Sequence, residues 1–397
     1  TRSLTTSPPS LDLHVLVSTH SGARHAAAFR ERVLSPLLSL AGLSTPAHYT
    51  VHTTSSPRSI SELTRTVFRP AAHAGRAQLI ALLSGDGGVV DVLNALHFPS
   101  ADADADTATA ADQDAQAPGF KRPAIALLPL GTGNALANSL GIAAADATFG
   151  LSALARGAPR ALPAFAARFS AGARMLVDEG RATEELPLRL PPPAPAAADA
   201  DGKAEAARRH PALLGAVVAS WALHAALVAD SDSAEYRARF GPERFQVAAR
   251  ELLFPEGGGG APHEFRGRVA DRQERREEWA DVPGTAHAYV LLTLVSHLER
   301  GFCVSPSSAP FAPRPHLVHL PPLSGGGADV MRVMGLAYQG GKHVGEEQVQ
   351  YEEVDGMRIT FEESEERWRR VCVDGKIVVV EEGGWVEVRM WEGREDG

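Results

Sequence analysis

Two glycine-rich segments constrain the fold of this chain more than any other feature. Ser84-Gly85-Asp86-Gly87-Gly88 follows the apolar stretch Gln78–Leu83, and Gly131-Thr132-Gly133-Asn134 follows Ala124–Leu128. Each segment also precedes a helix-like stretch. Because a strand, a glycine turn and a helix in that order form a crossover unit, its repetition predicts a mainly parallel sheet covered by helices.

A third unit of the same kind opens the chain. His14–Val17 reads as a strand, Ser21-Gly22 as a turn and Ala26–Leu40 as a helix, with Val33, Leu37 and Leu40 at helical spacing. After roughly Pro163 the pattern changes to β-branched runs broken by glycine and proline. The strand-like runs are Tyr289–Val295, Met357–Phe361, Val371–Val373, Ile377–Val380 and Val386–Met390.

The 397 residues exceed the usual size of one domain, so two domains are expected. We predict a Rossmann-like α/β domain over residues 11–163 and a β-sandwich domain over residues 164–397, with a nucleotide cleft between them. In this prediction the second domain binds a lipid and carries inserted loops.

The charge and the cysteines narrow the class of partner and the compartment. A formal net charge of -9 without a long basic run argues against nucleic acid, because binding phosphates needs clustered Lys and Arg. Cys303 and Cys372 lack metal-like spacing and favour a reducing compartment, so we expect a cytoplasmic protein. The first residues, TRSLTTSPPSLDL, do not resemble a signal peptide.

The run Ala212–Ala229 is apolar enough to be considered as a membrane span. It contains His224 and ends beside an Asp-Ser-Asp sequence, which is unusual inside a bilayer. We therefore expect a buried strand that continues into a second apolar segment, and no transmembrane segment. The membrane span stays open as the less favoured alternative.

Three segments lack the apolar periodicity of a core and are interpreted as inserted, solvated loops. They are Ala101–Ala117, Pro191–Arg209 and Pro255–Asp281. The charged run Glu362–Arg370 is interpreted as an exposed turn between strands.

The first glycine-rich segment combines backbone freedom with one carboxylate. Gly85, Gly87 and Gly88 let the backbone approach a phosphate, and the following helix offers unpaired N–H groups. Asp86 would repel a bare phosphate, so its presence points to a metal bridge, a hydroxyl partner or a proton acceptor. The alternative is that Asp86 only caps its own helix, as aspartate commonly does.

The second glycine-rich segment, residues 131–134, repeats this arrangement after the next strand. Both turns should converge at the carboxyl edge of the sheet, where open α/β sheets bind ligands. Asn134 could cap the following helix, and Thr132 could donate its hydroxyl to a phosphate. A P-loop is excluded, because no Gly-Lys pair is followed by Ser or Thr, and no G-x-G-x-x-G fingerprint occurs in either segment.

Ser84–Leu96 and Pro129–Leu140 resemble the paired signatures of the diacylglycerol kinase catalytic superfamily, and especially those of sphingosine (long-chain base) kinases. The resemblance implies an ATP-dependent lipid kinase that phosphorylates the hydroxyl of a sphingoid base, with ATP and Mg²⁺ as cofactors. It makes Asp86 the catalytic residue and Ser84 a substrate-binding residue. It assigns cofactor binding to Gly85, Gly87, Gly88, Asp91, Gly131, Thr132, Gly133 and Asn134.

The resemblance continues in the stretch Ala229-Asp230-Ser231-Asp232 and the Tyr-Arg and Arg-Phe pairs that follow it. In the family the second aspartate contacts the polar head of the sphingoid base, and two arginines face the nucleotide phosphates. By position these roles fall on Asp232, Arg237 and Arg244. Taken singly, each of these residues could also be a solvated charge after a core strand.

Other positions match the family only in part. Ser21-Gly22 stands where a longer phosphate loop is usual, and Thr54 resembles a threonine that touches the nucleotide. Asp374-Gly375 resembles the family's D-G-E motif, but Lys376 replaces the glutamate that helps hold magnesium there, and lysine cannot coordinate magnesium. The metal ligands are therefore left unassigned.

Two alternatives stay open beside the sphingoid base kinase. One is a diacylglycerol kinase, and the other is a catalytically impaired homologue that binds a nucleotide or a lipid, as Lys376 and the short first loop suggest. An enzyme with a lipid substrate is expected to contact a membrane surface peripherally. The sequence does not indicate an oligomeric state.

Overall fold

The computed structural model describes residues 11–98, 119–142, 147–186, 188–190, 210–255, 261–273 and 278–391. The chain forms two compact units, the first ending at Ala161 and the second beginning at Leu162. The expected insertions 101–117 and 191–209 lie outside the described residues.

The first unit contains a parallel sheet with the strand order β2-β1-β3-β4. Strands β1, β3 and β4 are mostly apolar, as expected for strands that are covered on both faces, whereas β2 at the edge is more polar. They are β1 (Leu11–Val17), β2 (Tyr49–Thr53), β3 (Ala77–Ser84) and β4 (Ala124–Pro129).

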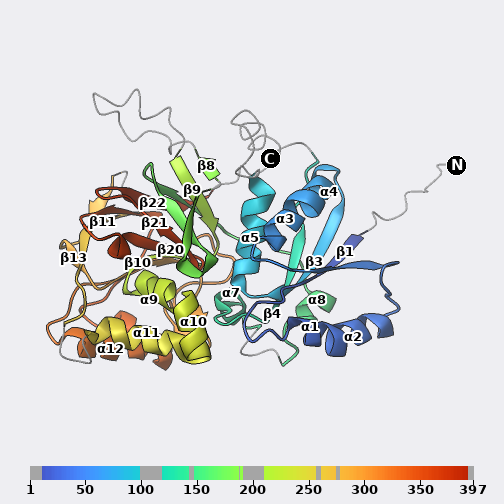
Figure 1. Cartoon of the computed structure of the whole chain (residues 1–397), viewed down its shortest axis with the longest axis horizontal. Coiled ribbons are helices and arrows are strands. Elements are labelled where there is room, and N and C mark those ends of the chain that lie inside the picture. Colours follow the sequence, from blue (N-terminus) through green and yellow to red (C-terminus); the bar gives the residue numbers. More distant parts are fainter. Residues whose placement is uncertain are drawn as a thin grey trace, which may run out of the picture. The chain divides into compact units, whose positions relative to one another are not determined.

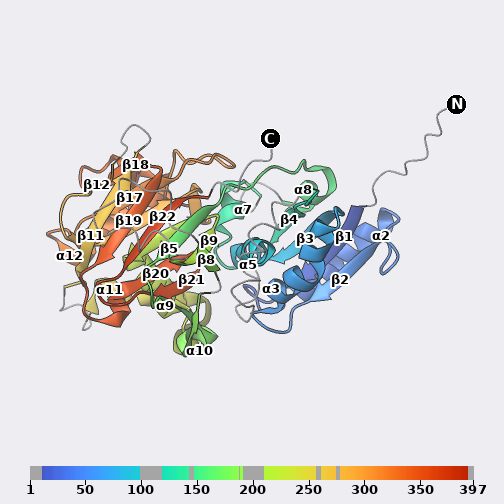
Figure 2. The same cartoon turned by 90° about the horizontal axis from the view of Figure 1, so that it is seen from above.

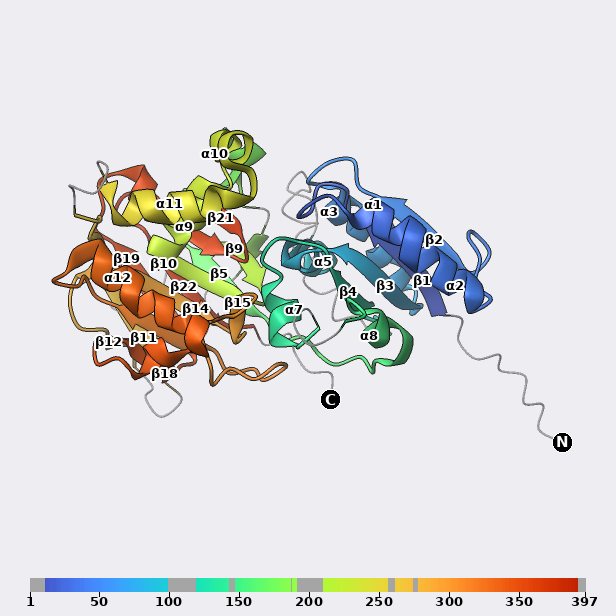
Figure 3. The same cartoon turned by 90° about the horizontal axis from the view of Figure 1, so that it is seen from below.

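Helices cover both faces of this sheet (Figures 1, 2 and 3). One face carries α1 (Ala26–Phe29), the π-helical turn η1 (Arg30–Leu34), α2 (Ser35–Leu40) and α8 (Leu151–Arg156). The other carries α3 (Ser59–Leu63), the π-helical turn η2 (Thr64–Phe68), α4 (Arg69–His73) and α5 (Asp86–His97). The short α7 (Ala135–Ser139) follows β4. The predicted α/β fold of this part is confirmed.

The helix expected over Ala26–Leu40 is present as α1, η1 and α2, but its buried face differs from the one that the spacing suggested. Ala26, Leu34 and Leu38 pack into the core with Val15 and Leu83. The apolar residues Val33, Leu37 and Leu40 are exposed instead.

The second unit is built from two antiparallel sheets. The first has the order β18-β17-β14-β10-β20-β21-β6-β7. Its strands are Gln350–Glu353 (β18), His316–Leu320 (β17), Tyr289–Thr293 (β14), Val218–Ala222 (β10), Arg370–Val373 (β20), Lys376–Val379 (β21), Arg174–Val177 (β6) and Ala182–Glu185 (β7).

The second sheet has the order β12-β11-β19-β22-β5-β9-β8, and β13 (Ala286–His287) also pairs with β11. Its strands are Ala280–Asp281 (β12), Phe265–Arg272 (β11), Gly356–Phe361 (β19), Trp385–Met390 (β22), Phe165–Phe169 (β5), His210–Gly215 (β9) and Leu188–Leu190 (β8). A separate hairpin joins β15 (His297–Glu299) to β16 (Phe302–Cys303).

The core of the second unit lies between its sheets. Trp221 is fully buried, and its ring meets those of Phe265 and Phe361 edge-on. Helices pack outside, with α9 against β20 and β10 (Figure 1). The helical segments are η3 (Asp178–Gly180), α9 (Leu223–Ser231), α10 (Ala234–Phe240), η4 (Gly241–Glu243), α11 (Arg244–Leu253), α12 (Gly326–Gly335), η6 (Leu336–Gln339), η7 (Lys342–Gly345) and η8 (Glu366–Arg369).

The apolar run Ala212–Ala229 does not form one long helix. It contains most of β9, all of β10 and most of α9, so the preferred interpretation as buried strand followed by a second apolar segment is correct. Among the described residues, no helix has the length and apolar character needed to cross a bilayer.

One expectation for a loop is wrong, and another holds in part, because the run Glu362–Arg370 does connect β19 to β20 and is mostly exposed. The segment Pro255–Asp281 contains β11, whose Phe265 and Val269 point into the core, because apolar residues alternate with arginines along the strand. In the charged run Glu362–Arg370, Glu363 and Arg369 are buried. The Glu363 carboxylate accepts the N–H of Arg266 and the Arg369 guanidinium donates to the carbonyl of Val380, so both charges serve the packing of the strands.

Candidate functional site

The carboxyl ends of the four parallel strands bring four loops together in the first unit. The Ser21 hydroxyl, after β1, lies 2.7 Å from the hydroxyl of Ser18 and 3.1 Å from that of Ser84, the last residue of β3. The backbone N–H of Thr19 donates to the hydroxyl of Thr54, after β2, over 3.0 Å. These bonds fix the loops after β1, β2 and β3 as one polar rim.

Glycines let two of these loops meet backbone to backbone. A Cβ added at Gly131 would overlap the Cα of Gly85, and one added at Gly22 would overlap the carbonyl of Leu130. Gly22 also has a φ of +52°, which other residues rarely adopt. The sequence therefore needs glycine at these positions to bring the ends of β1, β3 and β4 into contact.

The start of α5 combines a buried hydroxyl with an open glycine. Ser84 is buried, and a Cβ at Gly88 would clash with its side chain. Nothing lies within 4 Å of a Cβ built at Gly87, which is exposed. The first turn of α5 therefore offers backbone N–H groups next to free space, which suits an anionic ligand. The substrate-binding role of Ser84 stays a prediction.

Asp86 connects the two glycine-rich segments. Its carboxylate accepts the N–H of Ala135 over 2.5 Å and the N–H of Leu136 over 3.1 Å, so it caps α7, the helix after β4. Gly85, the N-cap residue of α5, makes no side-chain capping bond. Asp86 is therefore a helix cap, as the alternative interpretation expected, but the helix that it caps is α7.

The pKa of Asp86 reflects two opposing effects. Burial disfavours the charged carboxylate, whereas the N–H groups of Ala135 and Leu136 favour it. Burial is the larger effect and raises the pKa of Asp86 to about 6. A carboxyl group with this pKa is close to the protonation balance that a general base needs at neutral pH.

Asn134 stabilises its own loop instead of capping α7 through its side chain. Its Oδ1 accepts the N–H of Gly131 and its Nδ2 donates to the carbonyl of Gly131, both over 2.9 Å. The residue has a φ of +53°, and its side chain makes no capping bond to α7. The expectation that the Asn134 side chain could cap this helix is therefore corrected. In the same loop Thr132 is exposed and Gly133 is partly exposed. Asp91, which lies on α5, is also partly exposed.

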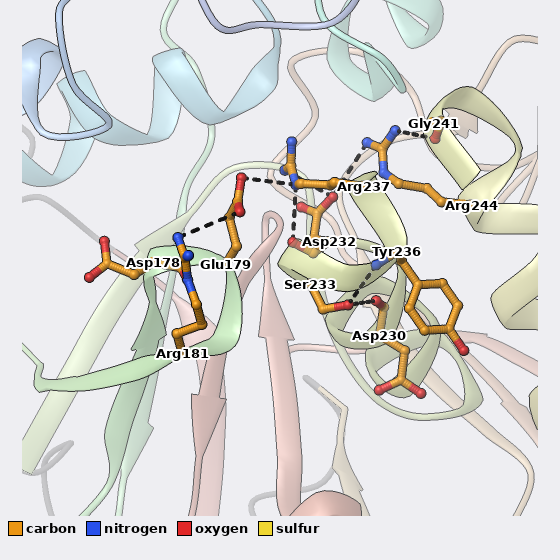
Figure 4. A network of polar contacts seen from close by, with 10 residues as sticks. All are labelled: Asp178, Glu179, Arg181, Asp230, Asp232, Ser233, Tyr236, Arg237, Gly241 and Arg244. Atoms are coloured by element: carbon orange, nitrogen blue, oxygen red, sulfur yellow. Dashed lines mark hydrogen bonds and ion pairs between the residues drawn. The ribbon is translucent and has the colours of Figure 1, made fainter. Parts of the chain in front are cut away.

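In the second unit, Asp232 gathers two arginines at the end of α9 (Figure 4). Its Oδ1 lies 3.1 Å from Nη2 of Arg237 and 3.4 Å from Nη2 of Arg244. Arg237 also donates from Nε to the carbonyl of Asp232, and Arg244 donates to the carbonyl of Gly241. The resemblance assigned these three residues to a binding site, and the structure brings them into one cluster.

A second carboxylate beside this cluster is fully engaged by its neighbours. Asp230 pairs with Arg367 at 2.8 Å and with Arg370 at 3.4 Å. Its carbonyl accepts the hydroxyl of Ser233. Asp230 thus joins α9 to the segment that leads into β20, which is a structural role.

Asp374 and Gly375 form the two-residue turn between β20 and β21. Both have positive φ, 49° and 84°, as an Asp-Gly hairpin turn requires. The Asp374 carboxylate accepts the N–H groups of Ala216, Val217 and Val218, the two shortest over 2.6 Å. The structure therefore gives Asp374 a structural role within the second unit, and its cofactor-binding role stays a prediction. Lys376 begins β21 directly after the turn.

The loops around Asp86 leave backbone space of the kind that a phosphate group needs. Among the described residues, no group of three or more His, Cys, Asp or Glu side chains could hold a metal ion. The loops after β1, β3 and β4 do provide backbone space that Cβ atoms would fill. Mg²⁺ is commonly held by phosphate oxygens and one or two carboxylates, and Asp86 is the carboxylate placed between these loops.

Sequence reasoning missed two parts of this site. It did not predict that Asp86 would bond to the second segment, because the contact spans 49 residues of sequence. It also missed Ser18 and Thr19, which link the loops after β1, β2 and β3. Their position directly after an apolar strand was the available signal.

The fold and the site define a parallel α/β domain whose glycine loops frame one carboxylate, joined to an antiparallel β-rich unit. Residues 12–166 match the family described as diacylglycerol kinase catalytic domain. No curated protein matches the chain.

Two solved structures of proposed diacylglycerol kinases from Bacillus anthracis str. Sterne resemble the whole chain. One has a TM-score of 0.54, 12% identity, and coverage of 96% of this chain and 94% of its own. The other has a TM-score of 0.53, 12% identity, and coverage of 95% and 94%. At 12% identity this likeness establishes the fold alone.

Proposed function

We propose that this protein is an ATP-dependent lipid kinase that transfers the γ-phosphate to the hydroxyl of a sphingoid long-chain base. The match of residues 12–166 to the diacylglycerol kinase catalytic domain supports kinase activity. The observation that carries the proposal is the position of Asp86, which lies between two glycine loops with a pKa raised to about 6.

In this proposal Asp86 accepts the proton of the lipid hydroxyl as that oxygen attacks phosphorus. The two N–H bonds from α7 hold the carboxylate in a fixed orientation. A base with a pKa near 6 is largely ionised at pH 7.5, yet basic enough to take a proton in the transition state. The Asp86 carboxylate would therefore both orient and activate the hydroxyl.

The nucleotide phosphates are proposed to lie over the glycine loops of the first unit. Gly85, Gly87, Gly88 and the segment 131–134 expose backbone without Cβ atoms, and Ser21 and Thr54 complete the polar rim. Bound Mg²⁺ would neutralise charge on the phosphates. Asp86 and Asp91 are the carboxylates of α5 that could contact it.

For the acceptor, the Asp232 cluster supports a cationic headgroup. Both arginines contact Oδ1 of Asp232, and no described residue forms a hydrogen bond or ion pair with Oδ2. That oxygen can accept a charge-assisted hydrogen bond from the ammonium group of a sphingoid base. Diacylglycerol offers no such charge, so the same oxygen gives it no comparable interaction.

Diacylglycerol is the second candidate acceptor, because the family matched by residues 12–166 is described by that substrate. Purified protein should be assayed with ATP and Mg²⁺ against sphingosine and against diacylglycerol in the same mixed micelles. We expect phosphorylation of sphingosine, and Asp232→Asn should raise KM for sphingosine more than it lowers kcat. Phosphorylation of diacylglycerol alone would eliminate the sphingoid base as substrate.

The remaining candidate is a catalytically impaired homologue that binds a nucleotide or a lipid. Lys376 supports it, because a glutamate is expected at that position by resemblance. If the impairment is real, Lys376→Glu should create or strongly increase phosphoryl transfer, whereas an active wild-type protein excludes this candidate.

A further inference from the structure

We infer that the outer face of α1, η1, α2 and α8 docks the protein on an anionic lipid bilayer. The first observation is a line of exposed apolar side chains on this face. Val33, Leu37 and Leu40 are 37%, 41% and 91% exposed, and Phe149, just before α8, is 51% exposed. Single exposed leucines are ordinary, but a row of them indicates an interaction surface.

The spacing of these residues makes them one surface. Positions 33, 37 and 40 follow each other at intervals of four and three, which places them on one side of a helix. Phe29, one turn before Val33, has its ring 6.3 Å from that of Phe149. The apolar surface therefore runs from Phe149 across Phe29 to Leu40.

The backbone at Phe149 holds an aromatic ring in solvent at an energetic cost. Phe149 has a φ of +51°, which is strained for a bulky residue. The following Gly150 has a φ of +83°, and a Cβ there would overlap the carbonyl of Leu127. This turn fixes Phe149 outward, and such strain is typical of functional surfaces.

The charge around the apolar surface selects the partner. Residues 11–161 as a whole carry eleven Lys and Arg and eleven Asp and Glu, so the basic character of this face is local. The segments that form this face, residues 20–42 and 147–161, contain five arginines and one glutamate. These arginines are Arg24, Arg30, Arg32, Arg156 and Arg160. A basic rim around an apolar strip fits the interface of an anionic membrane.

The same charge argues against a second copy of the chain as the occupant. Two copies that met through this face would bring together two rims with five arginines and one glutamate each, and like charges across an interface are unfavourable. An anionic bilayer provides both the apolar layer and the counter-charge. This inference deepens the proposed function by naming the surface through which the enzyme would reach a membrane lipid.

Vesicle sedimentation without nucleotide or substrate lipid tests the surface separately from catalysis. We expect binding to phosphatidylcholine vesicles that contain phosphatidylserine, and weaker binding to pure phosphatidylcholine. Leu37→Ser combined with Leu40→Ser should lower the partition coefficient by about tenfold or more. Arg32→Gln combined with Arg156→Gln should lower it by about fivefold per arginine and weaken its salt dependence.

Two further variants control for misfolding and for nonspecific adsorption to vesicles by exposed apolar side chains. Phe149→Asn removes the ring but tolerates a positive φ, so it should lose vesicle binding without losing thermal stability. Met331→Ser removes an exposed apolar side chain of α12, 46% exposed in the second unit, and should bind as the wild type does. The inference would be overturned if the wild-type protein did not bind anionic vesicles. It would also be overturned if the leucine variants bound them as tightly as the wild type. A dimer that these variants convert to monomer would assign the face to a second copy instead.

Discussion

The raised pKa of Asp86 predicts that this residue makes the first unit less stable as the pH rises. Its pKa is about 6 when folded, against 3.8 for a solvated carboxyl group. Folding then favours the protonated form, so the contribution of Asp86 to stability is complete below pH 3.8 and is lost as the pH rises through 6. A shift of about two units corresponds to about 3 kcal/mol.

Asp86→Asn removes this titration while keeping an oxygen that can accept one N–H from α7. The free energy of unfolding of the wild type should therefore fall relative to that of Asp86→Asn by about 3 kcal/mol between pH 4 and pH 7. Asp12→Asn is the matched control, since Asp12 lies at the opposite end of β1 and pairs with Arg76. It should leave the pH dependence of the wild type nearly unchanged.

The assay must report on the first unit. All five tryptophans lie in the second unit, so their fluorescence would miss the transition. Urea-dependent hydrogen exchange of peptides from β1, β3 and β4 measures the opening of the first unit directly. If the wild type gains stability over Asp86→Asn as the pH rises, the bonds from Ala135 and Leu136 outweigh burial, and the reasoning is refuted.

Three other substitutions test the geometry. Gly22→Ala should destabilise the first unit by about 1–3 kcal/mol and abolish nucleotide binding, because its Cβ would overlap the carbonyl of Leu130. Gly42 also has a positive φ, but a Cβ there meets open space. Gly42→Ala should therefore retain nucleotide binding when this is measured by calorimetry. Asp374→Ala should lower the free energy of unfolding by about 3 kcal/mol or more, since it leaves three buried N–H groups of residues 216–218 without an acceptor. Urea unfolding followed by tryptophan fluorescence measures this loss, and an unchanged midpoint would contradict the structural role of Asp374. Arg244→Ala should raise KM for ATP while leaving the thermal midpoint within a few degrees, and equal nucleotide affinity would remove this arginine from the proposed site.

Much of the fold was predictable because its signals are local. Glycine after an apolar strand and before a helix predicts a crossover unit, and three such units gave the parallel sheet of β1, β3 and β4. The runs around β14, β19, β20, β21 and β22 were recognised as strands from β-branched residues. These patterns depend on neighbours in sequence alone.

The parts that were missed depend on distant contacts. The strand β11 escaped recognition because arginines alternate with its core residues in a charged, glycine-rich context. Burial of Glu363 and Arg369 follows from partners in β11 and near the end of β21, which no local pattern reveals. The contact from Asp86 to α7 joins two turns that the sequence could place at one sheet edge but could not orient.

Transfer of phosphate from ATP to lipid by wild type and Asp86→Asn is the most direct test of the central claim. The measurement uses radiolabelled ATP, Mg²⁺ and sphingosine in mixed micelles at pH 7.5. The account predicts transfer by the wild type and a decrease in kcat of about 10²- to 10⁴-fold for Asp86→Asn, with nucleotide affinity largely retained. Equal rates for the two proteins would contradict the role of Asp86 as the base of a lipid kinase.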